Sequence, residues 1–249
     1  MRVAYCLYGQ PRRFKEGYEN IMNFLKKTPD ITFDFFYHTW FDKNLKNYEC
    51  SPWRFIGGEE LKVDSNIIEN LNELYKPVSY FYEPPINFDT SSLTDTIIYK
   101  NSEQYLINPV NNLLSQIHSR QAVRNLLDDY IKKTGIKYDL VISSRFDFLK
   151  EIHMNLNHID SSKLYTSRVL QPRHLITEPF LVTNVDMFIK IFYNMMDNEI
   201  INNKSLEKIV NQYNEHVNLT MESVFFTNFL HNFKSLESVV YTDLIPNFI

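Results

Sequence analysis

The residue types best suited to chemistry gather in two short segments, each directly after an apolar run. The first is residues 8–13 (YGQPRR). Its two guanidinium groups can pair with phosphate, its amide can read the edge of a base, and its glycine allows a tight backbone turn. The other reading is an ordinary turn between a strand and a helix with arginines on the surface. The spacing alone favours neither reading.

The second segment is residues 143–147 (SSRFD), where a cation and a carboxylate emerge directly after a buried run. A reaction that expels a diphosphate builds negative charge on oxygen. A divalent cation held by carboxylate oxygen, or a fixed guanidinium, stabilises that charge. Arg145 and Asp147 are the residue types for these two solutions. Taken alone, an Arg-x-Asp pattern carries little information, and a surface ion pair is the more common explanation.

The periodicity of apolar residues predicts the elements that carry these segments. Apolar runs indicate buried strands near residues 3–8 and 138–144, and β-forming residues indicate strands near 31–38 and 78–82. Helical spacing indicates helices between them. Strands that alternate with helices up to residue 150 predict right-handed βαβ units and a mostly parallel sheet. The carboxyl ends of parallel strands share one edge, so we expect both segments to border the same crevice.

The pattern changes after residue 150. Short strand-like pieces at 164–167 and 179–183 alternate with helical runs near 185–196, 205–214 and 221–231. No repeat or linker separates the halves, which predicts a single domain with two lobes, about 1–150 and about 151–249.

Composition limits the classes of function. The chain has 249 residues and a formal net charge of -4, with lysine and arginine scattered along it. This pattern argues against a nucleic-acid partner. Cys6 and Cys50 are too few for a disulfide framework. No apolar run approaches the roughly 20 residues of a membrane-spanning helix, so we expect a cytoplasmic protein without a transmembrane segment.

Four segments together resemble one family. In chain order they are YGQPRR, FDFFYHTW, SQIHSRQAVRNLL and YDLVISSRFDFL. The combination resembles GT-A-type glycosyltransferases of surface-polysaccharide gene clusters and large DNA viruses. In that group the strand-ending Arg-Phe-Asp stands where other GT-A enzymes carry an Asp-x-Asp metal motif. The resemblance covers residues 1–150 well and is looser beyond, where it depends on the segments around Glu178 and Glu222.

The resemblance implies a GT-A-like (Rossmann-like), mostly parallel central sheet flanked by helices. It implies transfer of a sugar from a nucleotide-diphosphate donor, UDP-linked, to a glycan acceptor in surface polysaccharide or glycoprotein glycan synthesis. Residues 1–150 would bind the nucleotide sugar and residues 151–249 the acceptor. Such an enzyme could lie peripheral to a membrane-bound glycan assembly system. The number of subunits stays open.

Carried over residue by residue, the resemblance assigns eight donor-facing residues: Tyr8, Gly9, Gln10, Arg12, His38, Trp40, Arg145 and Asp147. Asp147 would coordinate Mn²⁺ or Mg²⁺ that bridges the diphosphate. Arg145 replaces the first carboxylate of the usual motif. The metal would then be weakly held or dispensable, with Arg145 taking over part of the charge neutralisation.

An inverting enzyme also needs a group that takes the proton of the acceptor hydroxyl. Glu178 is the first candidate for this base and Glu222 the second, although Glu222 could simply favour the positive end of a helix. The remaining histidines, His118 among them, show no metal-ligand spacing on one helix face.

Two other functions stay open. One is a nucleotide-sugar-binding protein without catalysis, suggested by the missing first carboxylate. The other is a nucleotidyltransferase, against which the single glycine of residues 8–13 argues.

Overall fold

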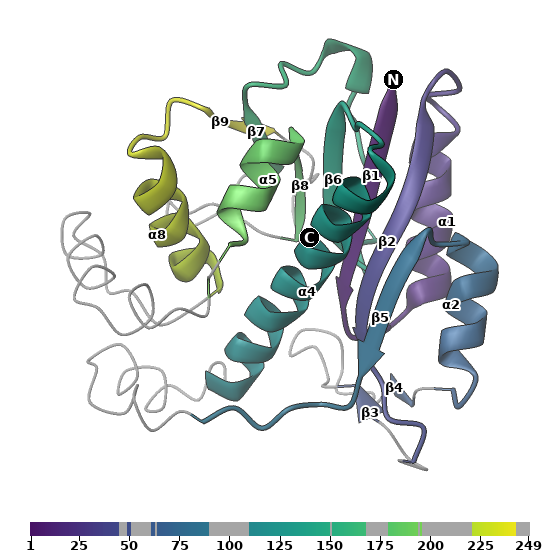
Figure 1. Cartoon of the computed structure of the whole chain (residues 1–249). Coiled ribbons are helices and arrows are strands. Elements are labelled where there is room, and N and C mark those ends of the chain that lie inside the picture. Colours follow the sequence, from purple (N-terminus) through teal and green to yellow (C-terminus); the bar gives the residue numbers. More distant parts are fainter. Residues whose placement is uncertain are drawn as a thin grey trace.

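The computed structural model describes residues 1–44, 49–50, 61–62, 64–89, 110–149, 151–167, 179–193, 195 and 221–242. Its centre is a seven-stranded sheet with the order β5-β2-β1-β6-β8-β7-β9 (Figure 1). The strands are β1 (Arg2–Gly9), β2 (Thr32–Trp40), β5 (Ser79–Glu83), β6 (Leu140–Arg145), β7 (Leu164–Ser167), β8 (Phe180–Thr183) and β9 (Val239–Thr242). A separate pair joins β3 (Glu49–Cys50) to β4 (Leu61–Lys62).

Strand directions make this sheet mostly parallel. β5, β2, β1 and β6 pair in parallel, and β8 runs antiparallel to β6. β7 is antiparallel to β8 and parallel to β9. β8 therefore runs against the other six strands. The architecture is the mostly parallel α/β sheet flanked by helices that the sequence predicts.

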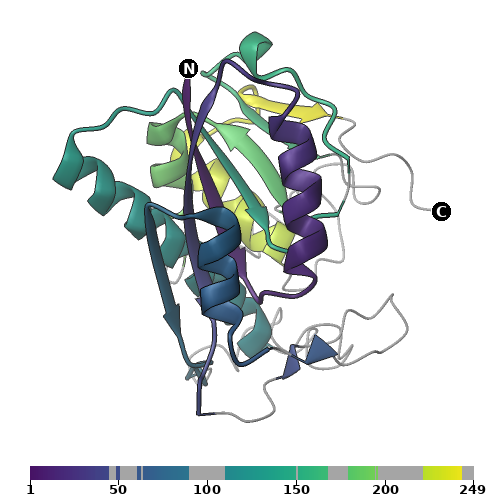
Figure 2. The same cartoon turned by 90° about the vertical axis from the view of Figure 1, so that its right-hand side faces the viewer.

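Helices cover both faces of the sheet (Figures 1 and 2). Alternate residues of β1, from Val3 to Leu7, belong to the core on the side of α1 (Phe14–Leu25) and α2 (Ile67–Tyr75). The intervening residues, from Ala4 to Tyr8, belong to the core beneath α4 (Val110–Thr134), α5 (Val185–Ile191) and α8 (Met221–Phe233). Burial on both faces explains why β1 is apolar almost throughout instead of alternating.

Most predicted elements are confirmed, with small differences at their ends. Between the predicted strands, helices form over Phe14–Leu25, Ile67–Tyr75 and Val110–Thr134. β3, β4 and β9 lie outside the predicted strands. The expected helix over 205–214 lies outside the described residues.

A glycine lets α1 pack closely on the end of β6. A Cβ atom added at Gly17 would lie 1.8 Å from the carbonyl oxygen of Phe146. One turn further along, Asn20 Nδ2 donates a hydrogen bond to the carbonyl oxygen of Phe148 at 3.0 Å. These contacts hold the start of α1 against the residues that follow β6.

Within the described parts of the chain, no helix combines the length and the apolar character needed to cross a bilayer.

Candidate functional site

One row of side chains crosses the carboxyl end of the four parallel strands. Tyr8 in β1 is paired in register with His38 in β2 and with Arg145 in β6. His38 in turn pairs with Phe81 in β5. Paired residues on neighbouring strands lie about 5 Å apart with side chains on the same face. Three residues expected to face a donor, from three distant segments, are therefore neighbours.

Two arginines hold the carboxylate of Asp147. Arg145 donates from Nε to Oδ1 at 2.8 Å and from Nη2 to Oδ2 at 2.7 Å. Arg12 Nη2 lies 2.9 Å from the same Oδ2. The side chains of Arg12, Asp147 and Arg145 are 11%, 14% and 22% exposed, so the group is shielded yet within reach of solvent. The segments after β1 and β6 thus meet at one edge of the sheet.

The surroundings of Asp147 do not fit a metal ion held by that carboxylate. Both of its oxygens already accept hydrogen bonds from guanidinium groups. A divalent cation bound there would lie beside two positive charges, which repel it. Arg12 and Arg145 are therefore the groups placed to neutralise a phosphate at this edge.

A second polar cluster occupies the carboxyl ends of β2 and β5, beneath α4. His38 Nε2 lies 3.1 Å from Oε1 of Glu83, and His118 Nε2 lies 2.6 Å from the same oxygen. His38 Nδ1 is hydrogen-bonded to Ser119 Oγ at 2.7 Å, and the N–H of Gly9 donates to Ser119 Oγ at 2.8 Å. The cluster is thereby connected to the end of β1.

The protonation states in this cluster follow from burial and pairing. Desolvation lowers the pKa of His38, and the hydrogen bond with Glu83 opposes that effect. The hydrogen bond from His38 lowers the pKa of Glu83. At neutral pH, Glu83 is therefore an ionised acceptor and His38 a neutral imidazole. If His38 donates to Glu83 from Nε2, its Nδ1 accepts from the Ser119 hydroxyl.

Gly9 fixes the transition from β1 to the loop. Its φ of +96° is a backbone conformation that residues with a side chain rarely adopt. Thr39 Oγ1 donates to the carbonyl oxygen of Gly9 at 2.9 Å, on the other side of the residue from the Ser119 contact. The glycine expected to make this turn does so, and two hydroxyl groups hold it in place.

Aromatic rings and a buried cation surround the row. The ring of Trp40 lies 5.0 Å from that of His38 and 5.2 Å from that of His118, between centroids. The Arg120 guanidinium is buried 4.2 Å above the ring of Tyr8 and donates from Nη2 to its hydroxyl at 3.3 Å. Tyr8 is therefore held rigidly in the row.

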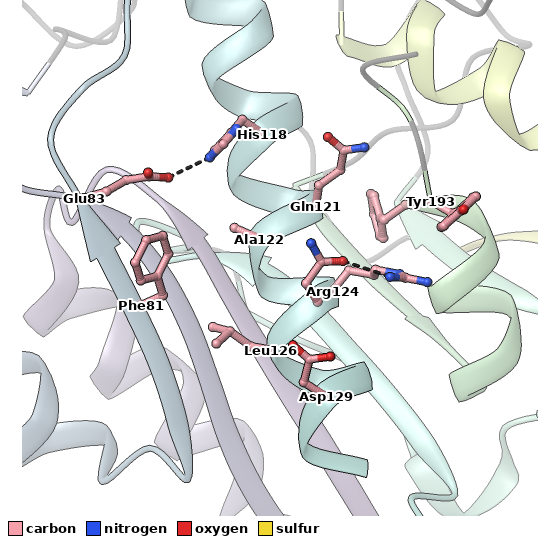
Figure 3. A pocket seen from close by; sticks show the side chains of 11 residues that line it. Phe81, Glu83, His118, Gln121, Ala122, Arg124, Leu126, Asp129 and Tyr193 are labelled. Atoms are coloured by element: carbon pink, nitrogen blue, oxygen red, sulfur yellow. Dashed lines mark hydrogen bonds and ion pairs between the residues drawn. The ribbon is translucent and has the colours of Figure 1, made fainter. Parts of the chain in front are cut away.

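A hollow of about 560 Å³ opens beside the histidine cluster (Figure 3). Its walls come from β5, from one face of α4 and from Phe192 and Tyr193 after α5. Glu83 and His118 are among its lining residues, so the cluster reaches solvent through this hollow. Asp147 is not one of the described residues that line this hollow. The carboxylate and the hollow mark two separate places along the same edge.

The structure brings all eight residues predicted to face a donor to one end of the sheet, at or just beyond the ends of β1, β2 and β6: Tyr8, Gly9, Gln10, Arg12, His38, Trp40, Arg145 and Asp147. Glu178 lies outside the described residues. Glu222 is half-buried in the first turn of α8, a helix that packs beside α4 and α5.

Sequence reasoning missed Glu83, His118 and Ser119 as parts of the site. Glu83 ends a strand just before two prolines, so the rule that singled out residues 8–13 and 143–147 also applies to it. The residues around His118 on its own helix show no metal-ligand spacing, because its partners lie on β2 and β5.

Comparisons with known proteins find no matching family model and no matching curated protein. Among solved structures, the galactosyltransferase LgtC in complex with donor and acceptor sugar analogues matches at 12% identity and a TM-score of 0.45. This match covers 97% of this chain and 73% of that one. An active-site mutant of LgtC matches at 11% identity and a TM-score of 0.44, over 97% and 72% of the two chains. Similarity at this level assigns neither a family nor a reaction.

Proposed function

We propose that the chain is a glycosyltransferase that moves a sugar from a nucleotide-diphosphate donor, UDP-linked, to a glycan acceptor. The observation that carries this proposal is the convergence of the segments after β1 and β6, where Arg12 and Arg145 share the carboxylate of Asp147. The two guanidinium groups lie at the same end of the sheet as Tyr8 and His38, with Arg145 directly in register with Tyr8. A donor diphosphate has the charge and the oxygen geometry that two guanidinium groups recognise.

The two arginines would stabilise the departing nucleoside diphosphate. As the bond between the sugar carbon and the phosphate oxygen breaks, negative charge collects on that oxygen. Asp147 holds Arg145 through two hydrogen bonds, so the guanidinium needs little rearrangement to meet this charge. Gln10 supplies an amide for a base edge, and the buried rings of Tyr8 and Trp40 hold the strand ends beside it. Added Mn²⁺ or Mg²⁺ is not needed at Asp147 in this scheme.

The acceptor side of the reaction depends on the sequence alone. Glu178 is the proposed base that takes the proton of the acceptor hydroxyl, with Glu222 as the second candidate. Residues 151–249 would then form the acceptor lobe, opposite the donor lobe of residues 1–150. The proposed setting is surface polysaccharide or glycoprotein glycan synthesis, in the cytoplasm at a membrane-bound assembly system.

The experiment combines a screen of nucleotide sugars with matched arginine variants. Release of nucleoside diphosphate is measured for the parent chain, Arg145→Lys and Arg12→Lys. Lysine keeps the charge and loses the forked donor geometry. Loss of one such donor is expected to lower kcat/KM by about 100-fold.

Arg2→Lys is the control. Arg2 pairs with Asp34 at 2.7 Å at the opposite edge of the same sheet, so its change alters a similar ion pair away from the site. We expect its turnover to equal that of the parent. Equal turnover in Arg145→Lys and the parent would remove the arginine group from the mechanism. Added Mn²⁺ is expected to leave turnover unchanged.

A nucleotide-sugar-binding protein without catalysis is the second candidate. It is favoured by the two oxygens of Asp147, both of which are already taken by guanidinium donors. In that case donor binding would raise the melting temperature of the protein. Adding an acceptor would not lead to release of the nucleoside diphosphate.

A further inference from the structure

We propose that His38, Glu83 and His118 form a binding site for a divalent transition-metal ion of the Zn²⁺ type. The three side chains come from β2, β5 and α4, and Figure 3 shows Glu83 and His118 pointing toward each other. The site is separate from the Arg12–Asp147–Arg145 group. The proposal does not depend on the proposed function.

The ligand atoms are already close enough to share one ion. One nitrogen from each histidine and one oxygen from Glu83 all lie within 4.8 Å of one another. Around a tetrahedral zinc ion the ligand atoms lie about 3.3 Å apart, given bonds of about 2.0 Å. His38 is fully buried, whereas the side chains of Glu83 and His118 are 20% and 31% exposed. Small rotations of the two outer side chains therefore close the set around an ion.

The donor types select the class of metal. Two imidazole nitrogens and one carboxylate oxygen suit zinc and its neighbours in the first transition row. Mg²⁺ and Ca²⁺ prefer oxygen ligands and fit this set poorly. On binding, both imidazoles would coordinate through Nε2, and the single proton of the His38 ring would shift from Nε2 to Nδ1, where it faces Ser119 Oγ. The carboxylate of Glu83 then bonds to the metal instead of accepting from both rings.

The residues around the cluster support His38 as a ligand. A histidine bound to metal through one nitrogen usually donates a hydrogen bond from the other, which fixes the ring. Ser119 Oγ stands 2.7 Å from His38 Nδ1 in that position. Trp40 packs against both imidazole rings, and the ring of Phe81 lies 5.6 Å from that of His38. These aromatic walls exclude water from one side of the site.

The other side of the site is open. Three protein ligands leave a fourth tetrahedral position, which water or a ligand oxygen can take. Glu83 and His118 line the hollow of about 560 Å³, so this position faces it. Ser119 connects His38 to the backbone of Gly9, which places the proposed ion at the same sheet edge as the end of β1.

Direct binding of metal to the full chain tests the proposal. The protein is first stripped with a chelator and then titrated with Zn²⁺ against a coloured competing chelator, and separately with Co²⁺ followed by visible absorption. We expect one equivalent of Zn²⁺ and a cobalt spectrum typical of low coordination number. His118→Ala and Glu83→Gln are each expected to weaken zinc binding by more than about tenfold. Loss of a residue that only hydrogen-bonds to a metal ligand already lowers metal affinity by that factor.

His153→Ala is the matched control. His153 and Glu151 form an exposed histidine–glutamate pair, 3.4 Å apart, away from the cluster. Its removal is expected to leave zinc affinity and the cobalt spectrum unchanged.

A thermal unfolding measurement distinguishes loss of metal binding from damage to the fold. Glu83→Gln retains an oxygen that can accept from both rings, and His118 lies at the surface, so both variants should melt cooperatively without metal. Zn²⁺ is expected to raise the melting temperature of the parent and of His153→Ala, and to leave both cluster variants unchanged. Zinc affinity equal to that of the parent in both cluster variants, or no cobalt spectrum in the parent, would overturn the proposal.

Discussion

Replacing Gly17 with alanine should destabilise the protein, although the same change inside a helix ordinarily stabilises by about 0.5 to 1 kcal/mol. The reason is the contact between α1 and the end of β6. The new Cβ would lie 1.8 Å from the carbonyl oxygen of Phe146, whereas Cβ atoms essentially never approach another heavy atom within 3.0 Å. The obstacle is backbone, so no side-chain rotation relieves it, and α1 must move by about 1.2 Å.

The expected size of the effect is that of an overfilled core, about 1 to 3 kcal/mol. For a chain of this length each kcal/mol lowers the melting temperature by about 2 to 4 °C, so the total loss is about 2 to 12 °C. In urea denaturation, the same loss in free energy of unfolding would appear as a lower midpoint with an unchanged slope.

Gly135→Ala is the comparison variant. The position of its Cβ is open space, but its φ of +69° disfavours a side chain. It is expected to cost about 1 to 2 kcal/mol through backbone strain alone.

The two glycine variants differ in a second measurement. Movement of α1 pulls Arg12 away from Asp147, now 2.9 Å apart, so Gly17→Ala is expected to lower donor affinity as well. Gly135 directly follows α4 and precedes the amino end of β6, away from the strand carboxyl ends. Its variant should therefore bind donor as the parent does. A Gly17→Ala protein at least as stable as the parent would refute the steric argument.

Three further predictions concern side chains of β1 and β2. Tyr8→Phe keeps the ring under the buried guanidinium and loses the hydroxyl contact, so it should cost about 1 kcal/mol in denaturation, and Tyr8→Leu should cost more because the cation–π contact is also lost. Burial raises the pKa of the Cys6 thiol, so in a Cys50→Ser background it should resist alkylation until denaturant unfolds the chain; rapid labelling in native buffer would contradict this. With Trp53→Phe leaving Trp40 as the single tryptophan, Zn²⁺ should change its emission with the affinity measured directly, and an unchanged emission would argue against binding beside it.

Much of the sheet could be predicted because its central strands are buried on both faces. Residues 3–8 and 138–144 are nearly continuous apolar runs, which mark parallel strands inside a helical cover. The rule that ligands bind at strand carboxyl ends then selected Tyr8 and Arg145 before their register was known, and the family resemblance added His38. The half-buried strand β9 has no such run and was missed.

The histidine cluster could not be predicted because it depends on how α4 crosses the sheet. His118 lies 35 residues from Glu83 and 80 from His38, and no periodicity relates the three. The role of Gly17 was equally hidden, since a close approach between a helix and a carbonyl leaves no trace in residue spacing. Both features belong to the packing of elements rather than to the elements themselves.

The position of β1 in the middle of the sheet also has a consequence for synthesis of the chain. Val3 pairs with Leu140, so β1 leaves the ribosome more than a hundred residues before one of its two neighbours. At about 5 to 20 residues per second, that interval is roughly 7 to 27 s. Throughout it, one edge of an apolar strand lacks its final neighbour, and a nascent chain stalled before β6 would be a natural client for chaperones.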